Sequence, residues 1–410
     1  MKVTKIEKCR VCGNTHIEEV LNLGEQELTG VFPKSTSDKL TSGLLDLYFC
    51  PECGLLQLGH SYSLEEMYGD NYGYRSGLNP SMVEHLSSKI HMLETRYNLK
   101  EEDVVLDIGS NDGTSLNSYQ TKGIRRIGMD PTGKKFHQYY NEGVELVPDF
   151  FSAKSFSEVC NKKAKIVTSI SMFYDLESPI EFAKQVNEVL ADDGIWHLEQ
   201  SYMPIMLRNN AYDTVCHEHL EYYSLGAIKY IMDAAGLQII EVTTNDINGG
   251  SFAITVAKKN SKYEENKSLI EWYFKQEKAM GLDTIQPYLE FAKRVEEHRT
   301  QFIDLLDSLV ADGKLVCGYG ASTKGNVLLQ YCGVTSEQIK VFGEVNPDKF
   351  GAYTPGTFIS IDDEAKVKAM KPDYLVVMPW HFRNNILAKE KEYLKSGGHF
   401  IFPLPFIEIV

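Results

Sequence analysis

The middle of the chain alternates short apolar runs with amphipathic stretches, from about residue 103 to residue 259. Strands buried on both faces of a parallel sheet read as continuous apolar runs, whereas helices show an apolar position every three to four residues. The last two runs flank Asn248-Gly249-Gly250, which predicts an antiparallel hairpin at the sheet edge. We expect a doubly wound α/β domain, entered through an amphipathic helix from Pro80 to about Arg96. The runs predict seven strands, near residues 103–109, 125–130, 145–148, 165–171, 194–200, 237–244 and 252–258.

A second α/β unit follows a helical connector. Residues 260–310 are charged and have the period of a helix, and residues 314–318 and 374–378 read as strands of the second unit. The pattern predicts a Rossmann-like C-terminal domain. The apolar stripe expected to be buried in the connector consists of Ile270, Trp272, Tyr273, Phe291, Val295, Phe302, Leu305 and Leu306.

The first strand of the middle domain ends in a glycine turn with the sequence DIGSNDG, residues 107–113. Asp130 ends the next strand about 20 positions later, where an acid accepts hydrogen bonds from a ribose diol. This geometry suits both a nicotinamide dinucleotide and S-adenosylmethionine. The carboxylate of Asp112, between Gly109 and Gly113, repels a pyrophosphate but suits an ammonium or a sulfonium, which favours S-adenosylmethionine. The candidate cofactor-binding residues are Asp107, Gly109, Asn111, Asp112, Gly113, Asp130, Pro131, Asp149, Phe150, Phe151 and Ser171.

The N-terminal segment carries two CxxC pairs, each followed by a glycine. Cys9 and Cys12 form one pair, and Cys50 and Cys53 form the other. Two such turns together predict a four-sulfur tetrahedral zinc site that is closed and therefore structural. Two disulfides or a redox CxxC are the alternatives, but neither explains the doubling or the matching glycines.

A tyrosine- and glycine-rich stretch, residues 66–77, lies between this segment and the middle domain. We interpret it as a lid whose phenols, above all Tyr72 and Tyr74, reach over the cofactor pocket. An ordinary surface turn with aromatic packing is the alternative.

The densest group of polar side chains lies in residues 212–224, YDTVCHEHLEYYS, before a helix expected to be capped by Ser224. In an extended loop, His217 and His219 share one side and Glu218 faces the other. The spacing is not the i, i+4 spacing of a helical zinc site, so we favour general acid–base catalysis over metal binding. A structural histidine is the alternative for either imidazole.

The second glycine turn has the sequence GYGASTKGN, residues 318–326. Compared with a dinucleotide turn it has one residue too many, and Ser322 and Lys324 add a hydroxyl and a cation that suit phosphate. We interpret it as a pocket for a diphosphate-bearing substrate, with a scaffold that binds no ligand as the alternative.

The composition limits the kinds of partner that the protein is expected to bind. The 410 residues include 57 acidic and 42 basic side chains, a net charge of −15, which argues against nucleic acid or anionic membrane as a partner. The first residues lack the apolar core of a signal peptide, and no run approaches the ~18 apolar residues of a spanning helix. We therefore expect a cytoplasmic protein whose eight cysteines are thiols or metal ligands.

Taken together, these motifs resemble those of the sugar C-methyltransferases that act on nucleotide-linked 4-keto-deoxysugars, as in tetronitrose biosynthesis. The resemblance spans the chain and includes the four cysteines, the lid, DIGSNDG, YDTVCHEH and GYGASTKGN. It implies a class I methyltransferase sheet that binds S-adenosylmethionine, with the sugar nucleotide held between the middle and C-terminal domains. It also implies that His219 is the base, Glu218 its neighbouring carboxylate, and Tyr72 or Tyr74 the lid tyrosine.

The sequence departs from that family in two places. Cys216 stands where the family enzyme has an active-site tyrosine, and residues 173–175 replace a histidine-bearing turn. The first departure is consistent with a different sugar or a different methyl acceptor. The candidate substrate-binding residues are Cys216, Tyr222, Ser322, Lys324, Asn326, Glu344 and His381.

The working hypothesis is C-methylation of a nucleotide-linked keto sugar through an enolate, at C3 of a 4-keto sugar. His219 is the expected base, Glu218 its orienting group, and His217 or a lid tyrosine the oxyanion donor. The expected parts are a zinc-binding module with the lid (1–75), the S-adenosylmethionine domain (76–259), and the connector with the sugar-nucleotide domain (260–410); this layout permits a monomer. The alternatives are a sugar-nucleotide O-methyltransferase, an NAD(P)-dependent keto-sugar oxidoreductase and a zinc-anchored binding protein without activity.

Overall fold

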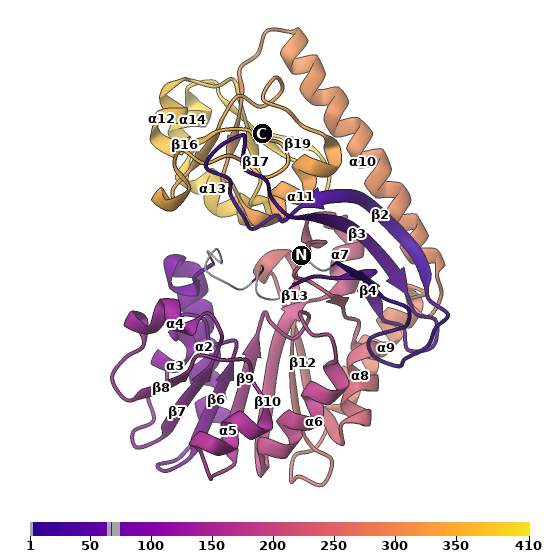
Figure 1. The fold of residues 1–410 in the computed structure, drawn as a ribbon, viewed down its shortest axis with the longest axis vertical. Coiled ribbons are helices and arrows are strands. Elements are labelled where there is room, and N and C mark those ends of the chain that lie inside the picture. The colour runs from indigo at the N-terminus through magenta and orange to yellow at the C-terminus, as the bar shows by residue number, and fades with distance from the viewer. Residues whose placement is uncertain (1–2, 64–66, 68–73) are drawn as a thin grey trace.

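The centre of the molecule is a seven-stranded sheet in the order β12-β13-β10-β9-β6-β7-β8 (Figure 1). The computed structural model describes residues 3–63, 67 and 74–410. All seven predicted strands are confirmed, and β13 is antiparallel to both of its neighbours, as the glycine hairpin predicts. The strands are β6 (Val104–Ile108), β7 (Arg125–Met129), β8 (Val144–Val147), β9 (Ala164–Ile170), β10 (Leu190–Ser201), β12 (Leu237–Asn245) and β13 (Ser251–Lys258).

Helices connect these strands, and two of the helix starts follow directly from the sequence. Pro80 begins α2 (Pro80–Arg96) after the Asn79 side chain caps it, and Ser224 caps α8 by accepting a hydrogen bond from the Ala227 amide. The remaining helical segments are η1 (Ser76–Leu78), α3 (Thr114–Asn117), α4 (Gly133–Phe136), η2 (His137–Tyr139), α5 (Ala153–Val159), α6 (Pro179–Val189), α7 (Met203–Arg208), η3 (Tyr212–Thr214), α8 (Leu225–Ala234) and η4 (Ile247–Gly249).

The N-terminal module forms its own four-stranded sheet in the order β11-β4-β3-β2. Its strands are β2 (Glu18–Glu27), β3 (Ser42–Phe49) and β4 (Leu56–Leu58), and a short pair of β1 (Thr4–Lys5) with β5 (His60–Ser61) lies beside it. The fourth strand, β11 (Glu221–Tyr222), comes from the middle of the chain and pairs antiparallel with β4. The segment that follows His219 is therefore part of the N-terminal sheet.

The C-terminal domain is a second Rossmann-like unit, as predicted. Its strand order, β16-β15-β14-β17-β18-β19, is the 3-2-1-4-5-6 order of that fold. The strands are β14 (Val316–Tyr319), β15 (Phe342–Glu344), β16 (Ile361–Asp363), β17 (Tyr374–Val377), β18 (His399–Phe402) and β19 (Glu408–Ile409). The helical segments are α11 (Thr323–Cys332), η5 (Pro347–Lys349), α12 (Glu364–Ala369), η6 (Trp380–Phe382), α13 (Arg383–Lys389) and α14 (Lys391–Lys395).

Two helices, α9 (Lys267–Ala279) and α10 (Gln286–Ala311), form the predicted connector, and α10 runs along one side of the molecule toward the C-terminal domain (Figure 1). The predicted buried stripe is wrong at Trp272, whose side chain is 52% exposed. The buried face of α9 passes through Ile270, Tyr273 and Glu277, and position 272 falls outside that arc. In the described part of the chain, no helix has both the length and the apolar character needed to cross a bilayer.

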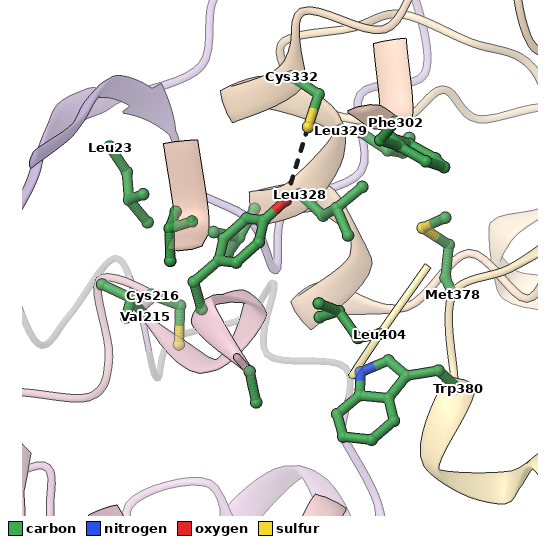
Figure 2. Close-up of a cluster of buried hydrophobic side chains, with 14 of the residues drawn as sticks. Leu23, Val215, Cys216, Phe302, Leu328, Leu329, Cys332, Met378, Trp380 and Leu404 are labelled. Atoms are coloured by element: carbon green, nitrogen blue, oxygen red, sulfur yellow. Dashed lines mark hydrogen bonds between the residues drawn. The ribbon is translucent and has the colours of Figure 1, made fainter. Parts of the chain in front are cut away.

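The N-terminal module, the connector and the C-terminal domain share one hydrophobic core with the segment that precedes β11. Figure 2 shows this meeting point, where the dashed line joins the Tyr212 hydroxyl to Cys332 Sγ at 3.6 Å. Its labelled side chains come from β2 (Leu23), the segment after η3 (Val215, Cys216), α10 (Phe302), α11 (Leu328, Leu329, Cys332) and the C-terminal end of the chain (Met378, Trp380, Leu404). This shared packing fixes residues 212–220, here called the HEH loop, relative to the C-terminal domain.

Candidate active site

A cavity of about 370 Å³ lies at the carboxyl edge of the central sheet. Most of the predicted cofactor-binding residues line it: Asp107, Gly109, Asn111, Asp130, Pro131, Phe150, Phe151 and Ser171. Asp112, Gly113 and Asp149 are not part of the lining. The cavity is thus where the glycine-turn argument predicts it, with a smaller set of residues.

The Asp130 carboxylate accepts hydrogen bonds from the glycine turn and from Thr132. The Asn111 amide donates to Asp130 Oδ2 at 2.8 Å, and the Thr132 amide and hydroxyl both donate to Oδ1 at 2.6 Å. Gly109 has a φ of +75°, and a Cβ there would lie 3.0 Å from the Met172 side chain. Glycine is therefore required at this turn for both reasons.

Asp112, a predicted cofactor-binding residue, bonds to the backbone of the predicted lid segment. It accepts a hydrogen bond from the Gly77 amide at 2.9 Å, and Asn111 Oδ1 accepts one from the Ser76 amide at 2.9 Å. These bonds hold the end of the predicted lid segment against the glycine turn. Tyr74 is 51% exposed and lines the cavity, whereas Tyr72 lies outside the described residues.

The cavity is acidic. The carboxyl groups that line it belong to Asp107, Asp130, Asp175 and Glu177, and no basic side chain is among the described residues of the lining. Burial raises the pKa of Asp107 to about 7, although the Thr168 hydroxyl, 2.6 Å away, counteracts it. Such a lining attracts a cationic ligand and disfavours a pyrophosphate.

A buried ion-pair cluster under the cavity is absent from the predictions. Glu199 in β10 contacts His85 Nε2 and Lys89 Nζ, each at 2.6 Å. Although burial opposes it, these two partners lower the pKa of Glu199 to about 2. The cluster holds α2 on the sheet, and Met82 and Leu86 of that helix line the cavity. The i, i+4 spacing of His85 and Lys89 places both side chains on one face of a helix, and this was the signal in the sequence that could have indicated the cluster.

The HEH loop turns instead of extending. The His219 amide donates to the Cys216 carbonyl at 3.1 Å, and the amides of Leu220 and Glu221 both donate to the Tyr174 carbonyl. Because of this turn, His217 and His219 do not share one side, so the extended-loop expectation is wrong. The loop is instead fastened to residues 171–177, here called the β9 turn, which follow β9 at the cavity edge.

His219 is held in one tautomer. Its Nδ1 lies 2.8 Å from the Thr214 carbonyl, which can only accept, so Nδ1 carries the proton and Nε2 the lone pair. Its ring packs against Tyr174 at 4.3 Å between centroids. Burial and the nearby Lys324 ammonium lower the pKa of His219 to about 4, which keeps the imidazole neutral at pH 7. The orienting group is the Thr214 carbonyl, where the sequence suggested Glu218.

His217 belongs to the N-terminal interface. Its Nε2 donates to the Gly43 carbonyl at 3.3 Å, its ring meets the edge of Tyr62, and it is fully buried. Glu218 has its carboxyl pKa raised by burial, and the Cys216 thiol is its hydrogen-bond partner. A side chain at Gly30 of the N-terminal module would lie 3.2 Å from Glu218 Oε1.

The C-terminal domain contributes a cation to this loop. Lys324 in α11 donates to the Asn248 carbonyl at 3.1 Å, and Asn248 Nδ2 lies 3.5 Å from Ser171 Oγ at the cavity. Burial and the Lys324 charge lower the pKa of His381 to about 3, as they do for His219. The Lys324 charge therefore acts on two imidazoles from different domains.

Asp213 is a buried residue of the same region that the predictions missed. It accepts a hydrogen bond from Trp380 Nε1 at 2.8 Å and so joins the HEH loop to η6. Burial raises the pKa of its carboxyl group, while Lys324 lowers it. Tyr222, a predicted substrate residue, is buried and donates to the Thr214 carbonyl at 3.5 Å.

Three of the predicted substrate-binding residues form hydrogen bonds within the protein. Ser322 caps α11 by accepting from the Gly325 amide, and Asn326 Nδ2 donates to the Thr29 carbonyl at 2.8 Å. Glu344 accepts from the backbone amides of Ala321, Val345 and Asn346. These side chains, which were expected to face a ligand, thus form hydrogen bonds with the N-terminal module and with the backbone of the C-terminal domain.

The four N-terminal cysteines come together. Their sulfur atoms all lie within 4.8 Å of one another, with Cys9 to Cys53 at 3.6 Å and Cys12 to Cys50 at 3.5 Å. Each CxxC turn is closed by a backbone bond from the following glycine to the first cysteine. Three of the four cysteines are buried.

Comparisons with known proteins agree with this arrangement. The chain is 32% identical over 407 residues to the C-methyltransferase NovU of Streptomyces niveus, covering 98% of this chain and 96% of that protein. It belongs to the C-methyltransferase family. Family models match in chain order: "Putative zinc binding domain" over residues 9–68, "Methyltransferase domain" over 81–242, and "C-methyltransferase C-terminal domain" over 246–405.

Solved structures resemble parts of this C-methyltransferase. An S-adenosylmethionine-dependent methyltransferase from Clostridium acetobutylicum is 14% identical, with a TM-score of 0.34, covering 43% of this chain and 92% of that one. The 1,6-didemethyltoxoflavin-N1-methyltransferase of Burkholderia thailandensis is also 14% identical, with a TM-score of 0.35, covering 48% and 85%. The family membership and the acidic cavity at the glycine turn identify the C-methyltransferase as S-adenosylmethionine-dependent.

Proposed function

We propose that this enzyme methylates a carbon next to the carbonyl of a nucleotide-linked keto-deoxysugar, at C3 of a 4-keto sugar, through a base-generated enolate. The observation that carries the proposal is His219, a neutral imidazole whose tautomer is fixed by the Thr214 carbonyl and whose pKa is lowered by the nearby Lys324 charge. A base with a cation nearby suits a reaction that removes a proton and creates an oxyanion.

The acidic cavity fits S-adenosylmethionine, which carries both a sulfonium and an ammonium. We assign Asp130 to the ribose hydroxyls, as the sequence motif suggests, and the apolar rings of Phe150 and Phe151 in the cavity lining to the adenine. The turn at Gly109 brings backbone to the cavity wall. Bound there, S-adenosylmethionine supplies an electrophilic methyl group.

The proposed reaction accounts for the transferred proton and for the electron pairs. His219 Nε2 takes a proton from the substrate carbon, and the C–H electron pair becomes the enolate double bond while the carbonyl oxygen gains negative charge. The same carbon then bonds to the methyl group as the methyl–sulfur bond breaks and the sulfur keeps that electron pair. The carbonyl is restored, and the by-product is S-adenosylhomocysteine. His219 lines a separate small cavity with Tyr174 and Thr214 and is not part of the cofactor cavity, so the proposal places the substrate between the two, beside the β9 turn.

Lys324 is the proposed oxyanion partner. His217, one of the two groups expected for this part, bonds to the N-terminal module instead. Lys324 makes His219 a weaker base, since its charge lowers the pKa of that imidazole, but the same charge stabilises the enolate. Tyr74, at the cavity mouth, is the described lid tyrosine that could cover the substrate.

The four cysteines are proposed to hold a structural zinc ion. Zinc–sulfur bonds of about 2.3 Å in a tetrahedron place the sulfur atoms about 3.8 Å apart. The observed separations are close to this value, at 3.5 Å between Cys12 and Cys50 and 3.6 Å between Cys9 and Cys53. All four positions are taken by protein, so the ion has no open site for catalysis. Metal analysis should find about one zinc per chain, lost in Cys53→Ser and kept in Cys160→Ser; a zinc-free wild-type protein would refute this.

The reaction itself is tested by mass spectrometry. A panel of nucleotide-linked 4-keto sugars is incubated with enzyme and S-adenosylmethionine, and any product heavier by one CH₂ is examined by NMR. A methyl group on the carbon next to the carbonyl supports the proposal. A methyl group on oxygen, the rival outcome, or no product from any keto sugar, contradicts it.

A further inference from the structure

Arg10 lies inside the first CxxC turn, between Cys9 and Cys12, yet its side chain is directed toward the methyltransferase domain. The guanidinium is 3% exposed and makes several contacts. Within the N-terminal module it donates to the carbonyls of Leu58 and His60 and to Ser61 Oγ. Across the interface its Nε lies 3.2 Å from Glu177 Oε2.

Glu177 is one of the acidic residues that line the cofactor cavity, at the end of the β9 turn. This turn also carries Tyr174, which packs against the His219 ring and accepts two backbone bonds from the start of β11. The turn is therefore shared between the cavity and the HEH loop.

The Arg10 charge also acts on a second acidic side chain. Glu221 in β11 is 2% exposed and accepts from the Leu176 amide at 3.4 Å, and the Arg10 charge opposes the increase in its pKa that burial causes. Arg10 thus pairs with an acid at the cavity and also acts through its charge on a buried acid of the strand that follows His219. Lysine cannot reproduce the several directed bonds of a guanidinium.

We propose that Arg10 is a positioning residue that couples the cysteine turn to the methyl-donor site by holding Glu177 and the β9 turn in place. This rests on the proposed function, in which the cavity binds S-adenosylmethionine. If Arg10 only neutralised Glu177, its removal would make the cavity more negative and the cationic donor would bind more tightly. If Arg10 holds the turn, its removal weakens binding.

The test compares Arg10→Ala, Arg10→Lys and Glu177→Gln with the wild type. We expect Arg10→Ala to raise the KM for S-adenosylmethionine and the Kd for S-adenosylhomocysteine about tenfold, with kcat at saturating donor within about threefold of the wild type. Glu177→Gln should have a similar effect, and the double variant should be no worse than the more affected single one, because both changes break one interaction. Arg10→Lys should recover only part of the affinity.

Arg383→Ala is the matched control, because Arg383 pairs with Glu408 at 2.7 Å in the C-terminal domain. It should leave donor affinity unchanged, and all variants should keep the metal content of the wild type. Unchanged or tighter donor binding in a folded Arg10→Ala protein overturns the inference. If Arg10→Ala does not fold, unchanged donor binding in Glu177→Gln overturns it. A wild-type protein that does not bind S-adenosylhomocysteine would instead refute the proposed function.

Discussion

The two Rossmann-like domains build the same glycine turn and use it differently. After β6, Gly109 has a φ of +75° and Asp130 accepts from the turn amide of Asn111 at 2.8 Å. After β14, Gly320 has a φ of +78° and Glu344 accepts from the turn amide of Ala321 at 3.1 Å. An acid on the neighbouring strand fixes the turn in both.

What lies above the turns differs. The central turn opens on the acidic cavity, whereas Lys349 in η5 donates to the Ala321 carbonyl at 2.8 Å and lies 3.5 Å from Glu344. Asn326 beside this turn donates a hydrogen bond to the Thr29 carbonyl of the N-terminal module. The comparison teaches that the turn alone does not make a nucleotide site. The C-terminal unit instead places Lys324 opposite the loop of the central domain.

The largest expected effect is at the loop between the two domains. His219→Ala should lower kcat about 1000-fold, because the base is lost, while S-adenosylhomocysteine affinity stays within twofold. Steady-state kinetics and calorimetry measure the two quantities. His399→Ala, an exposed histidine at the amino end of β18, should match the wild type. Near-normal turnover in His219→Ala would remove this residue from the mechanism.

Lys324 tests what the C-terminal domain contributes. Lys324→Met should lower kcat about 100-fold, as expected for loss of an oxyanion partner. Removing the positive charge should also raise the pKa of His219 from about 4, so the acid limb of the kcat/KM profile should move to higher pH. Lys395→Met, an exposed lysine of α14, is the control. An unmoved acid limb with unchanged kcat would separate Lys324 from the site.

The paired acids test the comparison itself. Asp130→Asn should weaken S-adenosylhomocysteine binding about tenfold, whereas Glu344→Gln should leave it within twofold, because only the first acid borders an open cavity. Both replacements remove charge from a turn with similar hydrogen bonds, so thermal unfolding should show a comparable loss of stability. Equal effects on ligand affinity would contradict the difference described here.

The smallest expected effect is no effect. NADH and NADPH should not bind, since Lys349 and the N-terminal module occupy the C-terminal turn and the central cavity is acidic. Calorimetry checks this: NADH and NADPH are titrated at the concentrations at which S-adenosylhomocysteine saturates the enzyme. Measurable binding, or oxidation of NADPH followed at 340 nm when a keto sugar is added, would revive the oxidoreductase alternative.

Much of this fold was predictable because its signals are local. The apolar runs located every strand of the central sheet, and DIGSNDG located the cavity. The helix starts at Pro80 and Ser224 followed from capping. The four cysteines were found by spacing alone, and the structure brings their sulfurs together.

The rest depends on contacts between distant segments. Nothing near His217 in the sequence indicates that Gly43 and Tyr62 surround it, and nothing near Asn326 indicates Thr29. The turn of the HEH loop is set by β11 pairing with β4, more than 160 residues earlier. Periodicity also misjudged Trp272, because one apolar residue beside a buried stripe looks like part of it.

The measurement that tests the account most directly is a crystal structure with S-adenosylhomocysteine bound. We predict that the ligand lies between Gly109 and Asp130, with its sulfur toward the β9 turn and His219. Ligand at the Gly320 turn, or a central cavity that stays empty at saturating concentration, would contradict the account.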